Sequence, residues 1–267
     1  MSSSVLKVEK KGGAAWLTLN RPEKRNAMTE EMLLGFIEHF TAFDQDPEVR
    51  VIVITGEGAG FCAGMDLAAL AGLVGGSSAD YREALRRVIL RGQSSLTIIE
   101  KCNKPVIAAV HGNCVGGGVD LLCVCDIRLA SRDAVFSVRE TKLALVADLG
   151  TLQRLPRLIG EPWARELCLT GRNFSAQEAR EANFITHLLE DKDALFRKAE
   201  ELAEELAANS PLAVQGVKDI MRFGRDNTVT AGLEYVAQKN SAILICDDFL
   251  EAATAAKEKR KPDFKGR

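Results

Sequence analysis

The sequence lacks the features that mark membrane proteins and nucleic-acid-binding proteins. No apolar run approaches the roughly 18 residues of a transmembrane helix, and the first residues contain no apolar signal core. Basic and acidic residues number 35 and 37, so there is no excess of positive charge for a nucleic-acid surface. The final Lys-Gly-Arg is unlike a Ser-Lys-Leu address. We therefore expect a cytoplasmic protein with no membrane or nucleic-acid partner.

The sequence also lacks the spacings of a zinc site and of the common nucleotide-binding loops. Of its seven cysteines only Cys123 and Cys125 form a close pair, and no second pair or histidine cluster completes a zinc site. Its glycine-rich stretches have neither the Lys-Ser/Thr ending of a P-loop nor the G-x-G-x-x-G spacing of a dinucleotide fold. We expect no metal ion, and reduced cysteines packed in the core.

What the sequence does contain is an alternation of strand-like and helix-like segments, followed by an almost wholly helical end. With 46% hydrophobic residues in 267, a sizeable core is possible. The alternation predicts an α/β core over residues 1–190, and the helical end predicts a C-terminal lobe over 191–267 whose surplus apolar stripes would pack on another subunit. The predicted strands span 5–10, 14–20, 51–55, 105–110, 126–131, 134–137 and 185–189, and the main predicted helices 29–44, 81–101, 151–159, 161–169, 175–181, 191–208, 211–223, 228–245 and 247–258.

Two glycine-rich loops each follow a buried strand and lead into a helix. The first runs from Phe61 to Leu67, and the second contains Gly116, Gly117 and Gly118. A helix N-terminus presents unpaired N–H groups and a positive partial charge, which favour an anion. If the two strands are adjacent, the N–H groups of both loops could converge on one carbonyl oxygen. The alternative is that the three glycines only turn the chain.

Three acidic residues near these loops are candidates for proton transfer: Asp120, Glu140 and Asp148. Each also has a structural interpretation. The helix dipole favours Asp120 in a first helical turn, Asp148 is placed to cap a helix that begins at Thr151, and Glu140 could face solvent. Together with the two loops, the three acids favour a catalytic site.

Several motifs resemble the crotonase (enoyl-CoA hydratase/isomerase) family over almost the whole chain. The resemblance implies an α/β crotonase (ClpP-like) fold, with a spiral core of repeated ββα units, a helical C-terminal lobe used in trimerisation, and a homotrimer or homohexamer. The motifs are Leu19-Asn-Arg-Pro-Glu-Lys-Arg-Asn-Ala-Met28, Phe61-Cys-Ala-Gly-Met-Asp-Leu67, His111-Gly-Asn-Cys-Val-Gly-Gly-Gly-Val-Asp-Leu121 and Gly150-Thr-Leu-Gln-Arg-Leu155.

The same resemblance implies a substrate site for an acyl-CoA thioester. The backbone N–H groups of Ala63 and Gly117 would form an oxyanion hole for the thioester oxygen, and Lys259 or Lys265 of a neighbouring subunit could meet the CoA phosphates. The CoA arrives as part of the substrate, so no cofactor is implied. The implied substrate contacts are Lys24, Arg25, Ala27, Ala63, Gly64, Met65, Asp66, Leu67 and Gly118.

Within the family, the acids resemble the Δ3,5-Δ2,4-dienoyl-CoA isomerase branch, whose pattern is G-G-V-D, then V-K-E, then A-A-D-[VL]-G-T-L-Q-R-L-P. The branch implies Asp148 as the base at the α-carbon, Glu140 as the acid at the far end of the diene and Asp120 as a third member, although base and acid could be exchanged. Two alternatives stay open. One is a 2-enoyl-CoA hydratase that uses Asp120 and Glu140, and the other is a non-catalytic crotonase homologue acting as a scaffold or RNA-binding module.

Overall fold

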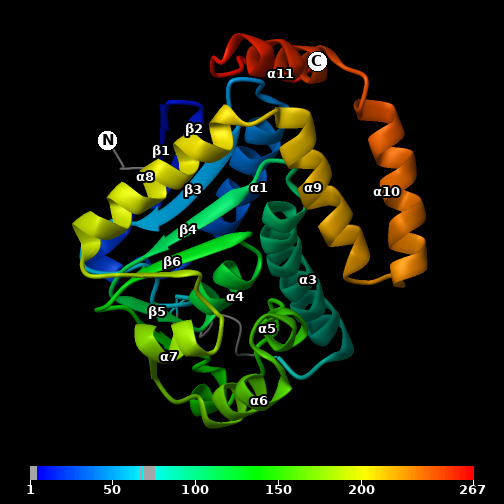
Figure 1. The fold of residues 1–267 in the computed structure, drawn as a ribbon. Helices are drawn as coiled ribbons and strands as arrows, with labels where there is room; N and C mark the ends of the chain where they lie inside the picture. The colour runs from blue at the N-terminus through cyan, green and yellow to red at the C-terminus, as the bar shows by residue number, and fades with distance from the viewer. Residues whose placement is uncertain (1–4, 67, 69–75) are drawn as a thin grey trace.

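A six-stranded sheet forms the centre of the computed structural model, which describes residues 5–66, 68 and 76–267 (Figure 1). Its strand order is β1-β2-β3-β4-β6-β9, and only the β1–β2 hairpin is antiparallel. All six residues of β3 are buried, as expected for a parallel strand covered on both faces. The strands are β1 (Leu6–Lys11), β2 (Ala14–Leu19), β3 (Val51–Gly56), β4 (Val106–Val110), β6 (Ile127–Ser131) and β9 (His187–Leu189).

A second, three-stranded sheet contains β5 (Asn113–Val115), β7 (Val135–Ser137) and β8 (Phe174–Ser175). The sequence patterns did not predict β5, because it has three residues and follows β4 after only His111 and Gly112. Gly112 makes this step between sheets possible. Its φ is +55°, and a Cβ atom there would lie 2.3 Å from the carbonyl oxygen of Ala59.

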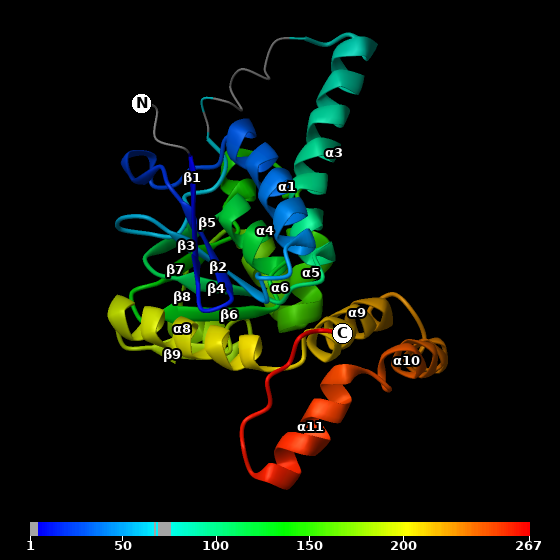
Figure 2. The same cartoon turned by 90° about the horizontal axis from the view of Figure 1, so that it is seen from above.

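Side chains alternate between the two faces of the sheet along each strand, so that both faces carry apolar side chains. Helices cover both faces. On one face, α1 (Glu30–Gln45), α3 (Ala79–Lys101) and α4 (Gly117–Cys123) pack over strand residues such as Leu17 and Ile52. On the other face, α8 (Lys192–Ala208) packs over Val51 and Val53 with a row of small and branched residues. Figure 2 shows α8 on one side of the strands and α1 and α3 on the other.

This packing shows that the predicted boundary at residue 190 does not separate the core from the lobe. Helix α8 contributes Leu195, Ala199 and Ala203 to the core beneath the sheet. The helices that stand away from the sheet are α9 (Pro211–Gly224), α10 (Val229–Ile243) and α11 (Asp247–Glu258) (Figure 2). That they serve oligomerisation stays a prediction.

The remaining elements surround the second sheet and the end of α4. They are α5 (Thr151–Ile159), α6 (Glu161–Thr170), α7 (Ala176–Glu181) and the 3₁₀ turns η1 (Pro22–Lys24) and η2 (Glu140–Leu143). Among the described residues, no helix combines the length and apolar character needed to cross a membrane.

Candidate active site

One wall of the candidate site is made by two loops that pair like short parallel strands. Ala63 N–H donates to the carbonyl oxygen of Arg25 (2.9 Å), Met28 N–H donates to Gly64 (2.8 Å), and Asp66 N–H donates to Met28 (2.9 Å). The backbone groups of residues 63, 64 and 66 that make these bonds therefore face the loop that precedes α1. In an extended segment, the backbone groups of the intervening residue face the opposite side.

The amide that faces away from this loop belongs to Met65, and it lies next to Gly117. The Met65 nitrogen is 3.6 Å from the position that a Cβ atom on Gly117 would take. Gly117 is the first residue of α4, so its own N–H has no partner within the helix. In the described part of the chain neither N–H donates a hydrogen bond. Two free N–H groups from adjacent loops thus lie close together, where they can bind one oxygen atom.

The structure therefore contradicts Ala63 as an oxyanion donor, because its N–H is already bonded to Arg25. The motif predicted the right loop and the wrong amide. Which amide is free depends on the pairing with residues 25–28, and the sequence of the loop alone does not show that pairing. The Gly117 N–H donates no hydrogen bond in the described part of the chain, and its place in an oxyanion hole stays a prediction.

A buried asparagine, which the sequence reasoning did not single out, fixes this pairing. Asn26 is fully buried, and its side-chain amide donates to the carbonyl oxygens of Glu57 (2.9 Å) and Gly60 (2.8 Å). Its oxygen accepts a bond from Arg21 N–H (2.9 Å). The Arg21 side chain in turn binds the Ala27 carbonyl (2.6 Å) and the Asp66 carboxylate (3.1 Å).

Asp120 lies inside α4 and binds the first residue of α5. Its Oδ1 accepts hydrogen bonds from the backbone N–H and the hydroxyl of Thr151, both at 2.7 Å. Asp120 thus satisfies the N-terminus of α5, where the residue at the N-cap is Gly150. The capping role considered for Asp148 is therefore performed by Asp120.

Glu140 is the first residue of η2, and Asp148 lies in the segment that connects η2 to α5. Glu140 is partly buried, and its Oε2 is buried without a hydrogen-bond partner in the described part of the chain. Its Oε1 lies 3.2 Å from where a Cβ atom on Gly116 would be. Asp148 is exposed in the single chain, and its carbonyl oxygen accepts a bond from the Gln93 side chain (2.7 Å). Glu140 therefore does not simply face solvent, and its buried oxygen is available to a ligand.

The ionisation of the three carboxyl groups is linked. Burial, together with the charges of Asp120 and Asp148, raises the pKa of Glu140 to about 7. Burial, with a smaller contribution from the charge of Asp148, raises the pKa of Asp120 to about 6 against the hydrogen bonds from Thr151. Partial burial raises the pKa of Asp148, although the residue as a whole is exposed in the single chain. The charges of Asp120 and Asp148 therefore reach Glu140, and the charge of Asp148 reaches Asp120.

The other predicted contacts are distributed around the two loops. Lys24 and Arg25 are exposed at η1, Ala27 and Met65 are partly buried, and Gly64 is buried.

Of the three remaining predicted contacts, Asp66, Gly118 and Leu67, the structure describes the first two. Asp66 is engaged by Arg21. Gly118 packs against Cys62 and Cys114, where a Cβ atom would lie 3.0 Å from Cys62 Cβ. Leu67 lies outside the described residues. The described residues also contain no group of three or more His, Cys, Asp or Glu side chains suited to a metal ion.

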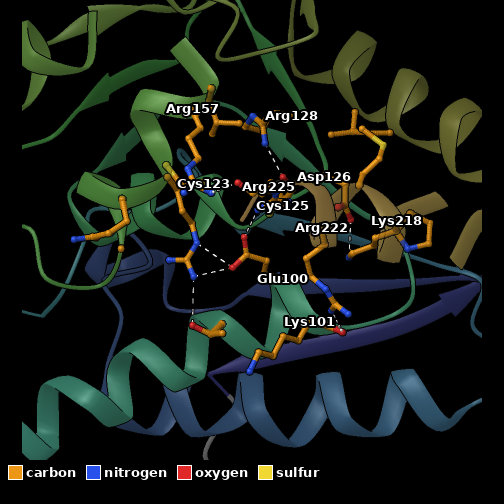
Figure 3. Close-up of a pocket in the computed structure, with 18 of the residues that line it drawn as sticks. Glu100, Lys101, Cys123, Cys125, Asp126, Arg128, Arg157, Lys218, Arg222 and Arg225 are labelled. Carbon is orange, nitrogen blue, oxygen red and sulfur yellow. Dashed lines mark hydrogen bonds and ion pairs between the residues drawn. The ribbon is translucent and has the colours of Figure 1, made fainter. Parts of the chain in front are cut away.

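A cavity of about 1110 Å³ lies behind the site, between α3, α5 and α9 (Figure 3). Leu149 and Gly150 line it, but Asp120, Glu140 and Asp148 do not. Most of its polar lining is charged, and Figure 3 shows Glu100 directed toward Arg225 within it. The three acids therefore do not line this cavity, but the two residues that follow Asp148 do.

Comparison with known proteins agrees with this arrangement. Residues 9–267 match the family model described as enoyl-CoA hydratase/isomerase. The peroxisomal Δ(3,5)-Δ(2,4)-dienoyl-CoA isomerase of Arabidopsis thaliana is 46% identical over 93% of this chain and 91% of its own length. The mitochondrial enzyme of the same name from Dictyostelium discoideum is 44% identical over 94% of this chain and 87% of its own.

Solved structures agree as well. The crystal structure of an enoyl-CoA hydratase from Bacillus anthracis superposes with a TM-score of 0.91, at 34% identity, over 98% of this chain and all of that one. The predicted fold and family are thus confirmed. The two isomerases are named peroxisomal and mitochondrial, so the cytoplasmic location stays a prediction.

Proposed function

Because the chain belongs to the enoyl-CoA hydratase/isomerase family, we propose that it is a Δ3,5-Δ2,4-dienoyl-CoA isomerase. The observation that carries this proposal is a partly buried Glu140 carboxyl on which the charges of Asp120 and Asp148 act, in a chain that also places two free amides together. Relatives that carry this name align with more than nine-tenths of the chain, which supports the same activity here.

The two amides would stabilise the charge that develops during the reaction. Removing a proton beside the thioester carbonyl places negative charge on its oxygen. The N–H groups of Met65 and Gly117 are suited to bind that oxygen, and the N-terminus of α4 adds its positive partial charge. Donors aimed at a charge that grows in the transition state accelerate the reaction, and each contributes about 2.7–4 kcal/mol.

The three acids would then move one proton along the diene. The Asp148 carboxylate takes a proton from C2 of the 3,5-diene, and the electron pair shifts through the chain of double bonds to give an extended enolate. The Glu140 carboxyl donates its proton to C6, and the product has its double bonds between C2 and C3 and between C4 and C5. Asp148 ends protonated and Glu140 ionised, and we assign Asp120 the relay that helps restore them. The reverse assignment of Asp148 and Glu140 gives the same product.

The Glu140 pKa fits this role. At a pKa of about 7 the group holds a proton in a substantial share of molecules near neutral pH, and its buried Oε2 has no competing partner in the described residues. An acid with an ordinary carboxyl pKa would be ionised almost completely at that pH.

Ultraviolet absorbance can test the proposal. The wild-type protein is incubated with a 3,5-dienoyl-CoA and, separately, with a 2-enoyl-CoA. We expect conversion of the first to a 2,4-dienoyl-CoA with little hydration of the second. Rapid hydration with an inert diene would instead establish the 2-enoyl-CoA hydratase alternative. Binding of both thioesters without turnover would establish the non-catalytic one.

A single variant separates these outcomes further. Asp148→Asn keeps the shape of the side chain and removes its charge, and Asp148 is exposed, so the fold should be little affected. We expect it to abolish diene isomerisation. A hydratase that uses Asp120 and Glu140 would retain its activity.

We also propose that CoA binds along the exposed η1 turn, near Lys24 and Arg25, and that the protein is a homotrimer or homohexamer. Support for the oligomer comes from α10, which buries none of its residues in the single chain and leaves Val229 and Leu233 80% and 66% exposed. Light scattering that gives the mass of a monomer would contradict the oligomer.

A further inference from the structure

We propose that Arg154, held in place by Glu100, is the positioning residue for Asp148. The proposal rests on the proposed function, in which Asp148 exchanges a proton with the substrate. Arg154 touches neither the substrate oxygen site nor the carboxylate of Asp148 in the described contacts. It acts on the backbone of the turn from which Asp148 projects.

Polar contacts from three different helices fix this turn. The Asp148 carbonyl is bound by Gln93 of α3 (2.7 Å), and the Thr151 amide is bound by Asp120 of α4 (2.7 Å). Between them, the Leu149 carbonyl accepts a bond from Arg154 of α5 (3.4 Å). Leu149 and Gly150 also line the large cavity, and Arg154 lies in the same lining.

The guanidinium of Arg154 is fitted closely to the turn. A Cβ atom on residue 150 would lie 1.9 Å from Nη1 of Arg154, so only glycine leaves room for the guanidinium. Gly150 has a φ of +121°, which glycine also adopts most readily. Because residue 150 has no Cβ atom, the Arg154 guanidinium lies directly against the chain between Asp148 and Thr151.

Glu100 holds the guanidinium in this position. Its Oε2 accepts bonds from Nε (3.1 Å) and Nη2 (2.8 Å) of Arg154, and Thr97 accepts a further bond from Nη2 (3.3 Å). The side chains of Arg154 and Glu100 are only 18% and 14% exposed. An ion pair with this geometry and burial orients its members better than an exposed pair does.

The same glutamate supplies a matched control. Its Oε1 is bound by Arg225, the residue that follows α9 (Figure 3), whereas its Oε2 is bound by Arg154. Arg154 and Arg225 therefore share one acidic partner, but only Arg154 binds the turn. Exchanging either arginine for lysine keeps the positive charge and removes the planar set of donors.

The test compares Arg154→Lys with Arg225→Lys in the full-length protein, with a 3,5-dienoyl-CoA as substrate. We expect Arg154→Lys to lower kcat about 10- to 100-fold, because a displacement of about 1 Å at a reacting group costs up to about 100-fold. The KM and melting temperature of Arg154→Lys should match those of Arg225→Lys. The control variant, Arg225→Lys, should keep kcat within about threefold of wild type. Deuterium exchange from D2O at C2 should fall together with kcat.

Equal kcat values for the two variants would overturn the proposal. If Arg154→Lys does not fold, Glu100→Gln serves instead. It keeps one oxygen acceptor, and unchanged kcat in that variant would also overturn the proposal. A wild-type protein that leaves the diene unchanged would refute the proposed function, and that result is distinct from either of these.

Discussion

Replacing Asp120 with asparagine should make the protein more stable and less active. Asp120 is 2% exposed, and burial raises its pKa from the usual 3.8 to about 6. A raised pKa means that the folded state favours the protonated form, so ionised Asp120 destabilises the fold above that pKa. The interval between 3.8 and about 6 corresponds to about 3 kcal/mol of unfolding free energy.

The size of the effect depends on pH in a way that a packing change cannot reproduce. Between the unfolded and folded pKa values the folded state binds more protons, so the stability of the wild-type protein falls as pH rises through this range. The asparagine oxygen can still accept both bonds from Thr151. Asp120→Asn should therefore gain up to about 3 kcal/mol at pH 7.5 and about half of that at pH 5.

Urea unfolding followed by tryptophan fluorescence measures the difference, at one protein concentration because association also contributes to stability. Asp120→Ala is the control. It leaves the Thr151 N–H and hydroxyl without their partner, so at each pH it should be about 1–3 kcal/mol less stable than Asp120→Asn. An asparagine variant that is equally destabilised at pH 5 and pH 7.5 would refute the reasoning. The gain in stability should accompany a loss of isomerisation, as for many catalytic groups held in unfavourable surroundings.

Two further predictions concern the acid and the amides. Because the Glu140 pKa is about 7 and Glu140 must carry a proton to act as the acid, kcat/KM should fall as pH rises through about 7, and Glu140→Gln should lose isomerisation. A profile that is flat from about pH 6 to 8 would contradict this role. Gly117→Ala places a methyl group 2.5 Å from Met28 Cε and 3.6 Å from the Met65 nitrogen. We expect kcat to fall about 100- to 1000-fold with calorimetric binding of the CoA thioester retained, and an unchanged kcat would exclude this oxyanion hole.

Periodicity and motifs predicted the elements of this chain well. The apolar run at Val51 gave the buried strand β3, and Thr29 gave the start of α1, where its hydroxyl caps the amide of Met32. These succeeded because each depends on residues that are neighbours in sequence. Strand β5 was missed because three residues are too few for a detectable alternation.

The site was predicted in part, and the failures share a cause. The motifs indicated the two loops and the three acids, and the charges of Asp120 and Asp148 do act on Glu140, but the catalytic role of these groups stays a prediction. The free amide was assigned incorrectly, and the alternative of a capping role for Asp148 at α5 was wrong. Both are set by contacts between distant segments, one from Arg25 to Ala63 and the other from Asp120 to Thr151. The alternation of residues along one segment carries no information about such contacts.

The pairing of the two loops has a consequence for how this scaffold changes its chemistry. The groups placed to hold the developing negative charge are main-chain amides, so an exchange of the Met65 side chain leaves its N–H group in place. The reaction is then decided by which carboxyl groups surround the amides. A lineage can alter Asp120, Glu140 or Asp148 one at a time and retain an anion-stabilising centre throughout, so new reactions can arise without passing through a protein that has lost the ability to hold an enolate.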